Sequence, residues 1–308
     1  MSKNVKKVLS VIVTAIFCML LSVGCSTKMT PKKLMLAVSE NLAKAKSVTN
    51  TMRMDIELET VLDTMKVSMK MDMESTVKPK AGHASGSAEV NFSGTKLASD
   101  IEIYQVNEGK EAVTYSRMYD KWSREAAAQA KTSTFDGNLF QEAGDSIESF
   151  RIAKQNVEIR EKECYQMYGD ITGKELLGFM GLDMMGAFGL IQIPDEKAIA
   201  SLQVPVTIEV YKEELLPARV IVDMTDVMND LYDKYDTSTN VNDFTIELAY
   251  TGFDDVKEIQ VPQEVKDAAQ EPAAQGDPAQ GVTDQGQNET GDGMTDQGQT
   301  GTGDGQTD

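Results

Sequence analysis

Two stretches of the chain carry methionine at every second position, a spacing with chemical consequences. The first holds Met52 and Met54, and the second holds Met69, Met71 and Met73. Thioether sulfur is a soft ligand that suits Cu(I), although the only histidine, His83, lies outside both stretches. Unbranched methionine side chains also pack into ordinary cores, or adapt to the irregular contents of a binding cavity. The spacing therefore leaves three interpretations, namely a copper site, core packing or the lining of a lipid cavity, and the absence of nearby histidines favours the last two over copper.

The N-terminus of the chain has the layout of a signal peptide. Three lysines precede an apolar run from Val8 to Leu21. That run is shorter than the roughly 20 residues that span a bilayer, and small residues followed by Cys25 close it. We therefore expect residues 1–24 to be removed and the mature chain to begin at Cys25.

The residues Leu21-Ser22-Val23-Gly24-Cys25 resemble the lipobox of bacterial lipoproteins, in which a small residue precedes the cysteine. Ser22 departs from the usual pattern, which places leucine three residues before the cysteine. The resemblance implies a diacylglyceryl group on the Cys25 thiol, and two acyl chains are enough for stable anchoring. We expect residues 25–29 to form an acylated tether that holds the chain on the extracytoplasmic face of the cell membrane.

Cys164 is left without a disulfide partner, because Cys18 leaves with the signal peptide and Cys25 carries the lipid. It lies in an alternating run of residues, where a small buried hydrophobic side chain fits better than a nucleophile. The fold must therefore be stable without disulfides.

The mature chain is strongly acidic. Loss of three lysines with residues 1–24 reduces the 30 basic residues to 27, against 49 acidic ones, which gives a formal charge of −22. This charge argues against nucleic acid as a partner. The sequence has no phosphate-binding glycine loop, dinucleotide fingerprint, nucleophile elbow or zinc-binding cysteine pair, and His83 follows a Pro-Lys-Ala-Gly turn that predicts a loop. We therefore expect no enzyme and no bound cofactor or metal.

Alternation of apolar and polar residues predicts antiparallel strands over much of the chain. The methionine stretches, whose apolar face includes Ile56, form a predicted hairpin of residues 51–59 and 65–74. Further strands are expected at 84–93, 101–106, 112–118, 157–168, 204–212, 218–224 and 244–250. Short connections between them predict a mainly antiparallel sheet of eight or more strands, which must curl or be covered by helices.

Three helices are expected to cover the apolar face of this sheet. The first begins at Thr30-Pro31, and a short second one begins at a capping box of Asp145 and Glu148. The third spans residues 174–191, with Leu176, Met180, Met184 and Phe188 on its apolar face. Each of its four glycines weakens a helix by roughly 1 kcal/mol relative to alanine. This segment is therefore either a core helix with close contacts or a movable flap over a cavity.

The chain loses its apolar periodicity beyond residue 266. Residues 267–308 are dominated by Gln, Gly, Asp and Thr, carry nine acidic residues without Lys or Arg, and include a short tandem repeat. A segment of this composition cannot form a core, so we expect a disordered acidic tail.

The order of these elements resembles that of the LolA/LolB-like and LppX/LprG-like lipoproteins, and most closely a related group from Gram-positive bacteria. The likeness covers residues 30–266 and rests on several stretches. They are Thr30-Pro31, the alternation from Met52 to Met73, Tyr115-Ser116-Arg117 leading to Trp122, Glu163-Cys164-Tyr165, and Ile246 to Tyr250 running into Val256–Ile259 and Val261–Val265. The resemblance implies an α+β fold in which a large curved antiparallel sheet, or half-barrel, carries helices on its concave face around an apolar cavity.

Two functions remain open at this stage. The first is a membrane-anchored lipoprotein that binds a lipid or another hydrophobic ligand in that cavity. Its predicted lining is Met52, Met54, Ile56, Met69, Met71, Met73, Leu176, Met180, Met184 and Phe188. The second is a non-enzymatic scaffold lipoprotein at the cell surface, whose interior is filled by its own side chains and whose protein partners the sequence does not name. A connected apolar void of several hundred Å3 would favour the first function.

Overall fold

The computed structural model describes residues 28–61, 63–118, 120–127, 140, 146–180, 200, 202–234 and 238–269. The chain forms two units, Met1–Glu271 and Pro272–Asp308, and every described residue belongs to the first. The predicted signal peptide, Cys25, most of the acidic tail, Met184 and Phe188 lie outside the described residues.

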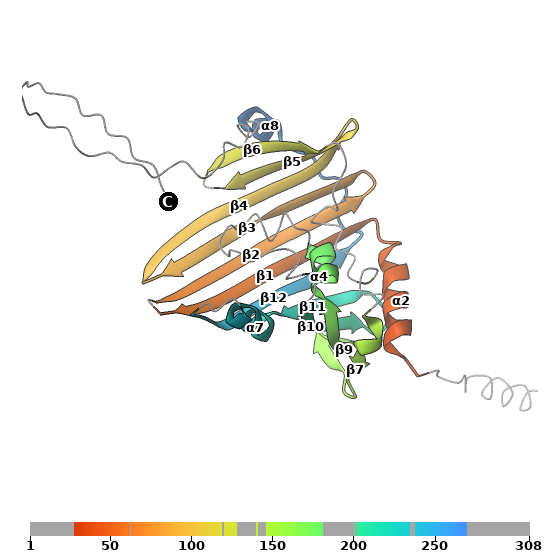
Figure 1. The fold of residues 1–308 in the computed structure, drawn as a ribbon. Helices are drawn as coiled ribbons and strands as arrows, with labels where there is room; N and C mark the ends of the chain where they lie inside the picture. The colour runs from red at the N-terminus through yellow and green to blue at the C-terminus, as the bar shows by residue number, and fades with distance from the viewer. Residues whose placement is uncertain are drawn as a thin grey trace, which may run out of the picture. The chain divides into compact units, whose positions relative to one another are not determined.

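A single antiparallel sheet of twelve strands forms the body of the first unit (Figure 1). The strands are β1 Ser47–Thr60, β2 Thr64–Val77, β3 Lys80–Phe92, β4 Thr95–Glu108, β5 Glu111–Met118, β6 Lys121–Ala127, β7 Arg151–Ile152, β8 Val157–Ile159, β9 Lys162–Thr172, β10 Gln203–Tyr211, β11 Pro217–Asp223 and β12 Thr239–Phe253. Their order is β6-β5-β4-β3-β2-β1-β12-β11-β10-β9-β7, and β8 pairs with β9 outside this path. Strands β6 and β7 end the path without meeting, so the sheet is open, and the prediction of a mainly antiparallel sheet is confirmed.

Strands β1 to β6 form a meander, because each pairs with the next along the chain. Tight turns with positive φ angles join some of them, as at Ser93 and Gly94, with φ of 52° and 76°, between β3 and β4. The last strand, β12, returns to the free edge of β1 and pairs with it from Val48 to Thr60. This pairing joins the meander to β11, β10 and β9, so residues 200 positions apart in the chain become neighbours.

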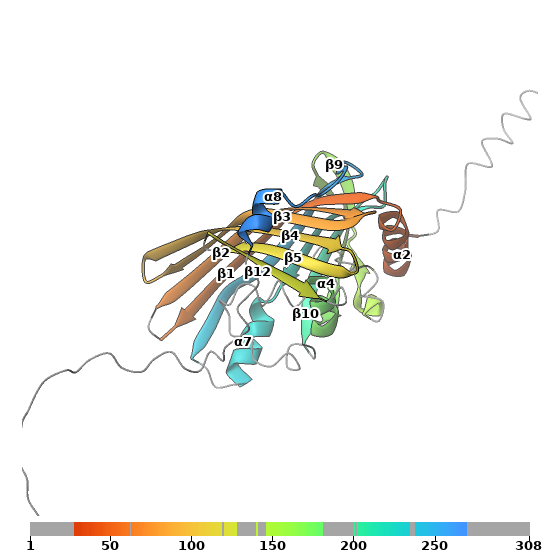
Figure 2. The same cartoon turned by 90° about the horizontal axis from the view of Figure 1, so that it is seen from above.

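Three helices in the described part of the chain contribute side chains to its largest buried cluster. They are α2 Pro31–Leu42, α4 Gly173–Met180 and α7 Thr225–Lys234. Helix α2 begins as predicted, since the Lys33 amide donates a 3.4 Å hydrogen bond to the Thr30 hydroxyl and Pro31 follows the cap. A fourth helix, α8 Gln263–Ala268, belongs to a separate cluster and lies on the other side of the sheet from α4 and α7 (Figure 2).

The structure differs from the predicted elements in two places. Residues 157–168 form a hairpin of β8 and β9 rather than one strand, because Arg160 and Glu161 turn the chain with φ of 51° and 64°. The short second helix is a 3₁₀ turn, η1 Ile147–Ser149, and Ser146 before it makes no capping hydrogen bond with its side chain.

Further features were not predicted, among them strands β6 and β7. His83 lies within β3 and not in a loop, because β3 begins at Lys80, directly after the turn that follows β2. Helices α7 and α8 were not expected at all. Each is short, with buried residues confined to Val227, Met228 and Leu231 in α7 and to Val265 in α8.

Candidate functional site

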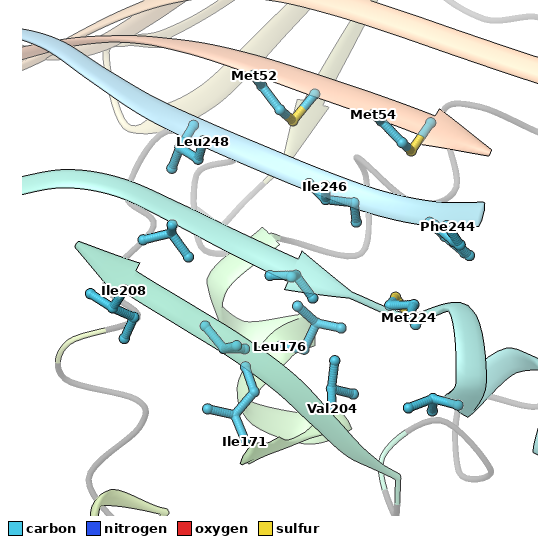
Figure 3. Packing of buried hydrophobic residues seen from close by; sticks show 14 of the residues in the cluster. Met52, Met54, Ile171, Leu176, Val204, Ile208, Met224, Phe244, Ile246 and Leu248 are labelled. Carbon is cyan, nitrogen blue, oxygen red and sulfur yellow. The ribbon is translucent and has the colours of Figure 1, made fainter. Parts of the chain in front are cut away.

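The methionine stretches form one continuous buried surface, which we call the methionine face and define as Met52, Met54, Ile56, Met69, Met71 and Met73. The exposed fractions of these six side chains lie between 2% and 6%. Met52 lies directly opposite Met71, and Met54 opposite Met69, in the register of β1 and β2. Figure 3 shows Met52 and Met54 beside Leu248, Ile246 and Phe244 of β12, with their side chains toward the interior. The predicted sharing of one apolar face is confirmed.

Small residues of β3 border the methionine face. Ala84, Gly86 and Ala88 lie opposite Met73, Met71 and Met69. A Cβ atom at Gly86 would overlap the Lys70 carbonyl oxygen and approach the Met71 Cα atom to 2.8 Å, so this position requires glycine. The methionines therefore have flexible side chains as neighbours within their own hairpin and short side chains on the β3 side, an arrangement that suits variable apolar contents.

Helix α4 brings one predicted residue to the same cluster. The helix is fixed by a capping box, in which the Glu175 amide donates to the Thr172 hydroxyl at 3.2 Å and the Thr172 amide donates to Glu175 Oε2 at 2.6 Å. Leu176 is fully buried in the cluster that contains the methionine face (Figure 3). Met180 is the last residue of α4, whereas Met184 and Phe188 fall outside the described part of the chain.

Two polar residues on this face were not predicted as site residues. Asn50 of β1 lies opposite Met73 of β2 and opposite Tyr250 of β12, so all three share the face of Met52. The signal for Asn50 was available, because it continues the methionine alternation two residues before Met52 with a polar side chain. Nothing in the sequence indicated that Asn50 pairs with Tyr250, because that pairing depends on the register of two strands far apart in the chain.

The opposite face of β3 to β6 carries an aromatic cluster, which consists of His83, Glu102, Tyr104, Arg117 and Trp122. The rings of His83 and Tyr104 stack at 4.3 Å between centroids. The Tyr104 hydroxyl donates to Glu102 Oε1 at 3.0 Å, and the Arg117 guanidinium lies 5.8 Å from the centroid of the Trp122 ring. Burial, and then the hydrogen bond to Glu102, raise the pKa of Tyr104 to about 12.

The segment that follows β12 covers part of this opposite face. Ile259 and Val265 pack in one cluster with Tyr104, Val113 and Tyr115. Glu108 receives hydrogen bonds from Tyr115 at 2.9 Å and Arg124 at 3.4 Å, and pairs with Lys266 of α8 at 3.2 Å. Burial opposes ionisation of Glu108, but these three donors outweigh it and lower the pKa of the carboxyl group.

A buried carboxylate lies further along the sheet, also on the face opposite the core. The side chain of Glu209 is 2% exposed, and its Oε2 accepts a 2.6 Å hydrogen bond from Arg219 Nε while its Oε1 accepts one of 3.0 Å from Gln166. Cys164 lies two residues before Gln166 on β9, opposite Tyr211 of β10. It is fully buried and forms no disulfide. Burial raises the pKa of its thiol to about 11, which agrees with the prediction of a small buried side chain and not a nucleophile.

Neither a metal cluster nor a membrane span is found in the described ranges. No group of three or more His, Cys, Asp or Glu side chains there could hold a metal ion. Among the same residues, no helix has the length and apolar character needed to cross a membrane.

Comparison with solved structures finds distant similarities. LprF from Mycobacterium bovis is 12% identical, with 75% of this chain and 96% of that chain covered and a TM-score of 0.46. The lipoprotein LppX from Mycobacterium tuberculosis is 12% identical, with 75% and 98% covered and a TM-score of 0.39. A beta-barrel-like DUF1849 protein from Brucella abortus is 8% identical, with 68% and 98% covered and a TM-score of 0.25. LppX belongs to a group that the sequence resembles, but TM-scores this low carry no argument about fold or function.

Comparison with protein families gives a stronger result. No curated protein matches the chain. A family model does match residues 30–270, from the residue that caps α2 to just beyond the end of α8. The chain therefore belongs to DUF6612, a family of unknown function.

Proposed function

We propose that this protein is an extracytoplasmic lipoprotein, anchored through Cys25, that binds a lipid or another hydrophobic ligand against the methionine face. In this proposal the sheet is curved, its concave face carries the helices, and α4 with the residues after it covers the ligand. The observation that supports the proposal is the pairing of Met52 with Met71 and of Met54 with Met69 beside the short side chains of β3. No catalytic step is assigned.

The energetics of such a site favour a long apolar chain. Burial of a methylene group contributes roughly 0.8 kcal/mol, so ten methylenes offer about 8 kcal/mol before the costs of ordering the ligand and the protein. Methionine and alanine side chains supply no hydrogen bonds that would select one chain over another. The methionine face therefore selects for apolar length and not for a particular chemical group.

The scaffold function makes the opposite prediction about the interior. If the protein's own side chains fill the space beside the methionine face, an added ring there must displace them, and overpacking of this kind typically costs about 1 to 3 kcal/mol. If the space takes a ligand instead, an added ring will fill it and exclude the ligand at little cost in stability.

The test uses Ala84→Phe, because Ala84 is 2% exposed and lies opposite Met73. The matched control is Ser87→Phe, at an exposed position of the same strand whose side chain is on the other face. The ligand-binding function predicts co-purified lipid and binding of diphenylhexatriene in the parent and in Ser87→Phe, with at least about tenfold weaker binding in Ala84→Phe. Absence of lipid and of probe binding from the parent, together with a destabilised Ala84→Phe variant, would establish the scaffold function.

The anchor is tested separately by Cys25→Ala. We expect the parent to incorporate radiolabelled palmitate and to sediment with membranes, because two acyl chains give stable anchoring. The Cys25→Ala variant should do neither. Incorporation of the label by Cys25→Ala would remove the anchor from the proposal and leave the ligand site untouched.

A further inference from the structure

Asn50 and Tyr250 place two polar groups side by side on an otherwise apolar face. They are register partners on the adjacent strands β1 and β12. Side chains of directly opposed residues in an antiparallel pair have Cβ atoms about 4.5 to 5.5 Å apart. Met73 flanks Asn50 on β2, and Leu248 precedes Tyr250 on the same face of β12. The two polar side chains therefore begin at neighbouring positions on one face of the sheet.

Neither the Asn50 carboxamide oxygen nor the Tyr250 hydroxyl has a hydrogen-bond partner among the described residues. Asn50 Oδ1 is buried and accepts no hydrogen bond. Tyr250 is 4% exposed, and within the described ranges its hydroxyl group takes part in no hydrogen bond. Burial raises the pKa of Tyr250, with no contribution from any neighbouring charge or hydrogen bond. Buried polar groups in proteins are almost always paired, and an unpaired one lowers stability. The buried Asn50 Oδ1, next to a tyrosine hydroxyl that makes no hydrogen bond with the described residues, therefore calls for an explanation.

The described residues around these two side chains offer no buried cation to an ionised ligand. Arg160 donates a 3.1 Å hydrogen bond to the main-chain carbonyl oxygen of Tyr250, but its side chain is exposed and its charge acts on Tyr211, in the cluster of the other face. The cluster that contains Tyr250 and the methionine face consists of apolar residues and tyrosines. Among the described residues, the charged side chains that are buried are Glu175 and Glu209. Glu209 lies on the other face, with Arg219, and Glu175 is hydrogen-bonded to Ser146 and Thr172, so neither supplies a cation. A carboxylate or a phosphate beside Asn50 and Tyr250 would be desolvated without a cation, which is strongly unfavourable.

We propose that Asn50 Oδ1 and the Tyr250 hydroxyl bind the uncharged polar group of a neutral lipid whose acyl chain lies along the methionine face. The ligand class is an ester or amide that also carries a hydroxyl group, as in a monoacylglycerol. Asn50 accepts the hydrogen bond of the ligand hydroxyl, and Tyr250 donates to the carbonyl oxygen of the ester or amide. This inference rests on the proposed function, because it assigns the polar end of the same ligand.

The test compares three probes that differ in their polar group. Residues 26–308, which contain every described residue, are titrated at pH 8 with 1-oleoylglycerol, with oleate and with diphenylhexatriene. The two oleoyl ligands share one acyl chain, and diphenylhexatriene has no polar group. We expect the parent to bind 1-oleoylglycerol at least tenfold more tightly than oleate, a difference of about 1.4 kcal/mol.

Two variants remove one polar group each with little change in volume. Tyr250→Phe and Asn50→Leu should each weaken binding of 1-oleoylglycerol about tenfold and change the affinity for diphenylhexatriene less than twofold. Neither should lower the melting temperature, because neither removes a side-chain hydrogen bond to a described residue. The matched control is Tyr211→Phe, a buried tyrosine in the cluster of Cys164 on the other face, which should leave all three affinities unchanged.

The outcomes separate this inference from the function on which it rests. If the parent binds diphenylhexatriene but prefers oleate, or if both variants keep the affinity of the parent for 1-oleoylglycerol, the polar site is refuted and the hydrophobic site stands. If the parent binds none of the three probes, the proposed function fails and the inference fails with it.

Discussion

The two faces of the sheet use buried polar groups in opposite ways. On the side of the methionine face, Asn50 Oδ1 is buried without a hydrogen bond, and the Tyr250 hydroxyl makes none with the described residues. On the other face, Tyr104 donates to Glu102, Tyr115 donates to Glu108, and Glu209 is held by Arg219 and Gln166. One atom departs from this contrast, since Arg117 Nε on the other face is also buried without a partner. Apart from that atom, the polar groups named on the opposite face are hydrogen-bonded to other protein groups. The polar groups beside the methionine face are left for a ligand to pair.

This contrast shows why burial alone does not identify a site. Both faces hide tyrosines from solvent, and the exposed fractions of Tyr104 and Tyr250 are 8% and 4%. The difference lies in what the hydroxyl groups contact. Helix α8 and the residues before it cover part of the opposite face, and the hydrogen-bonded and charged pairs there specify a single arrangement. On the methionine face, the unbranched side chains can adapt to different contents.

The largest expected effect comes from breaking the buried ion pair of the opposite face. Arg219→Met leaves the Glu209 carboxylate buried without a cation, and loss of one partner of such a pair costs about 3 to 5 kcal/mol in the free energy of unfolding. Chemical denaturation of the variant measures this loss. In contrast, Lys66→Met removes the partner of Glu57 in a pair whose side chains are 60% and 33% exposed, and should cost less than about 1 kcal/mol. Equal losses of unfolding free energy in the two variants would show that Glu209 does not depend on Arg219 as a buried partner.

We expect Tyr104, on the opposite face, to make the stability of the protein depend on pH. Its pKa is raised to about 12 in the fold, from about 10 in the unfolded chain. A raised pKa favours the protonated fold, so this contribution is complete below pH 10 and is lost as the pH rises from 10 to 12. Over that range we expect the protein to lose on the order of 2 kcal/mol more stability than Tyr104→Phe, measured by denaturation at each pH. If the stability of the two proteins falls equally between pH 10 and pH 12, the raised pKa of Tyr104 does not contribute to stability.

The paired and unpaired tyrosines can be compared directly at neutral pH. Tyr104→Phe removes a hydrogen bond to the carboxylate of Glu102 and should lower the free energy of unfolding by about 1.5 kcal/mol. Tyr250→Phe removes a hydroxyl group that has no partner among the described residues, and it should leave stability unchanged or raise it by up to about 1 kcal/mol. Thermal denaturation of the two variants measures both changes. A loss in Tyr250→Phe as large as that in Tyr104→Phe would show that the two faces do not differ.

The sequence was sufficient to predict those features that depend on local periodicity. Met52 and Met71 were expected on one face because alternation has a period of two and only a short turn separates the two strands, and the structure pairs them directly. The start of α2 was equally local, because Thr30 and Pro31 are adjacent. The hairpin at Arg160 and Glu161 was missed because neither residue is one of those that usually adopt positive φ.

The rest of the candidate site depends on long-range pairing. Asn50 meets Tyr250 because β12 returns to β1, and the register of this pair shifts between Thr49 and Asn50. No local pattern predicts such a shift, so the periodicity of the sequence could not predict the polar end of the site. Gly86 is similar, because its requirement for glycine comes from the close approach of β2, which only the assembled strands reveal.

The smallest expected effect concerns the end of the chain. Residues 272–308 form a unit separate from the one that holds the sheet, and their composition provides no core. A chain that ends at Glu271 should therefore melt within about 1 °C of the complete protein, since surface changes away from packed features usually alter stability by less than 0.5 kcal/mol. A chain that ends at Val261 is the matched control. It also loses α8, with Val265 on the aromatic cluster and Lys266 paired to Glu108, so its melting temperature should fall by several degrees. A large fall on removing residues 272–308 alone would show that the acidic tail stabilises the sheet. No fall on removing α8 would show that the opposite face does not need this covering, and the contrast between the two faces would then rest on their hydrogen bonds alone.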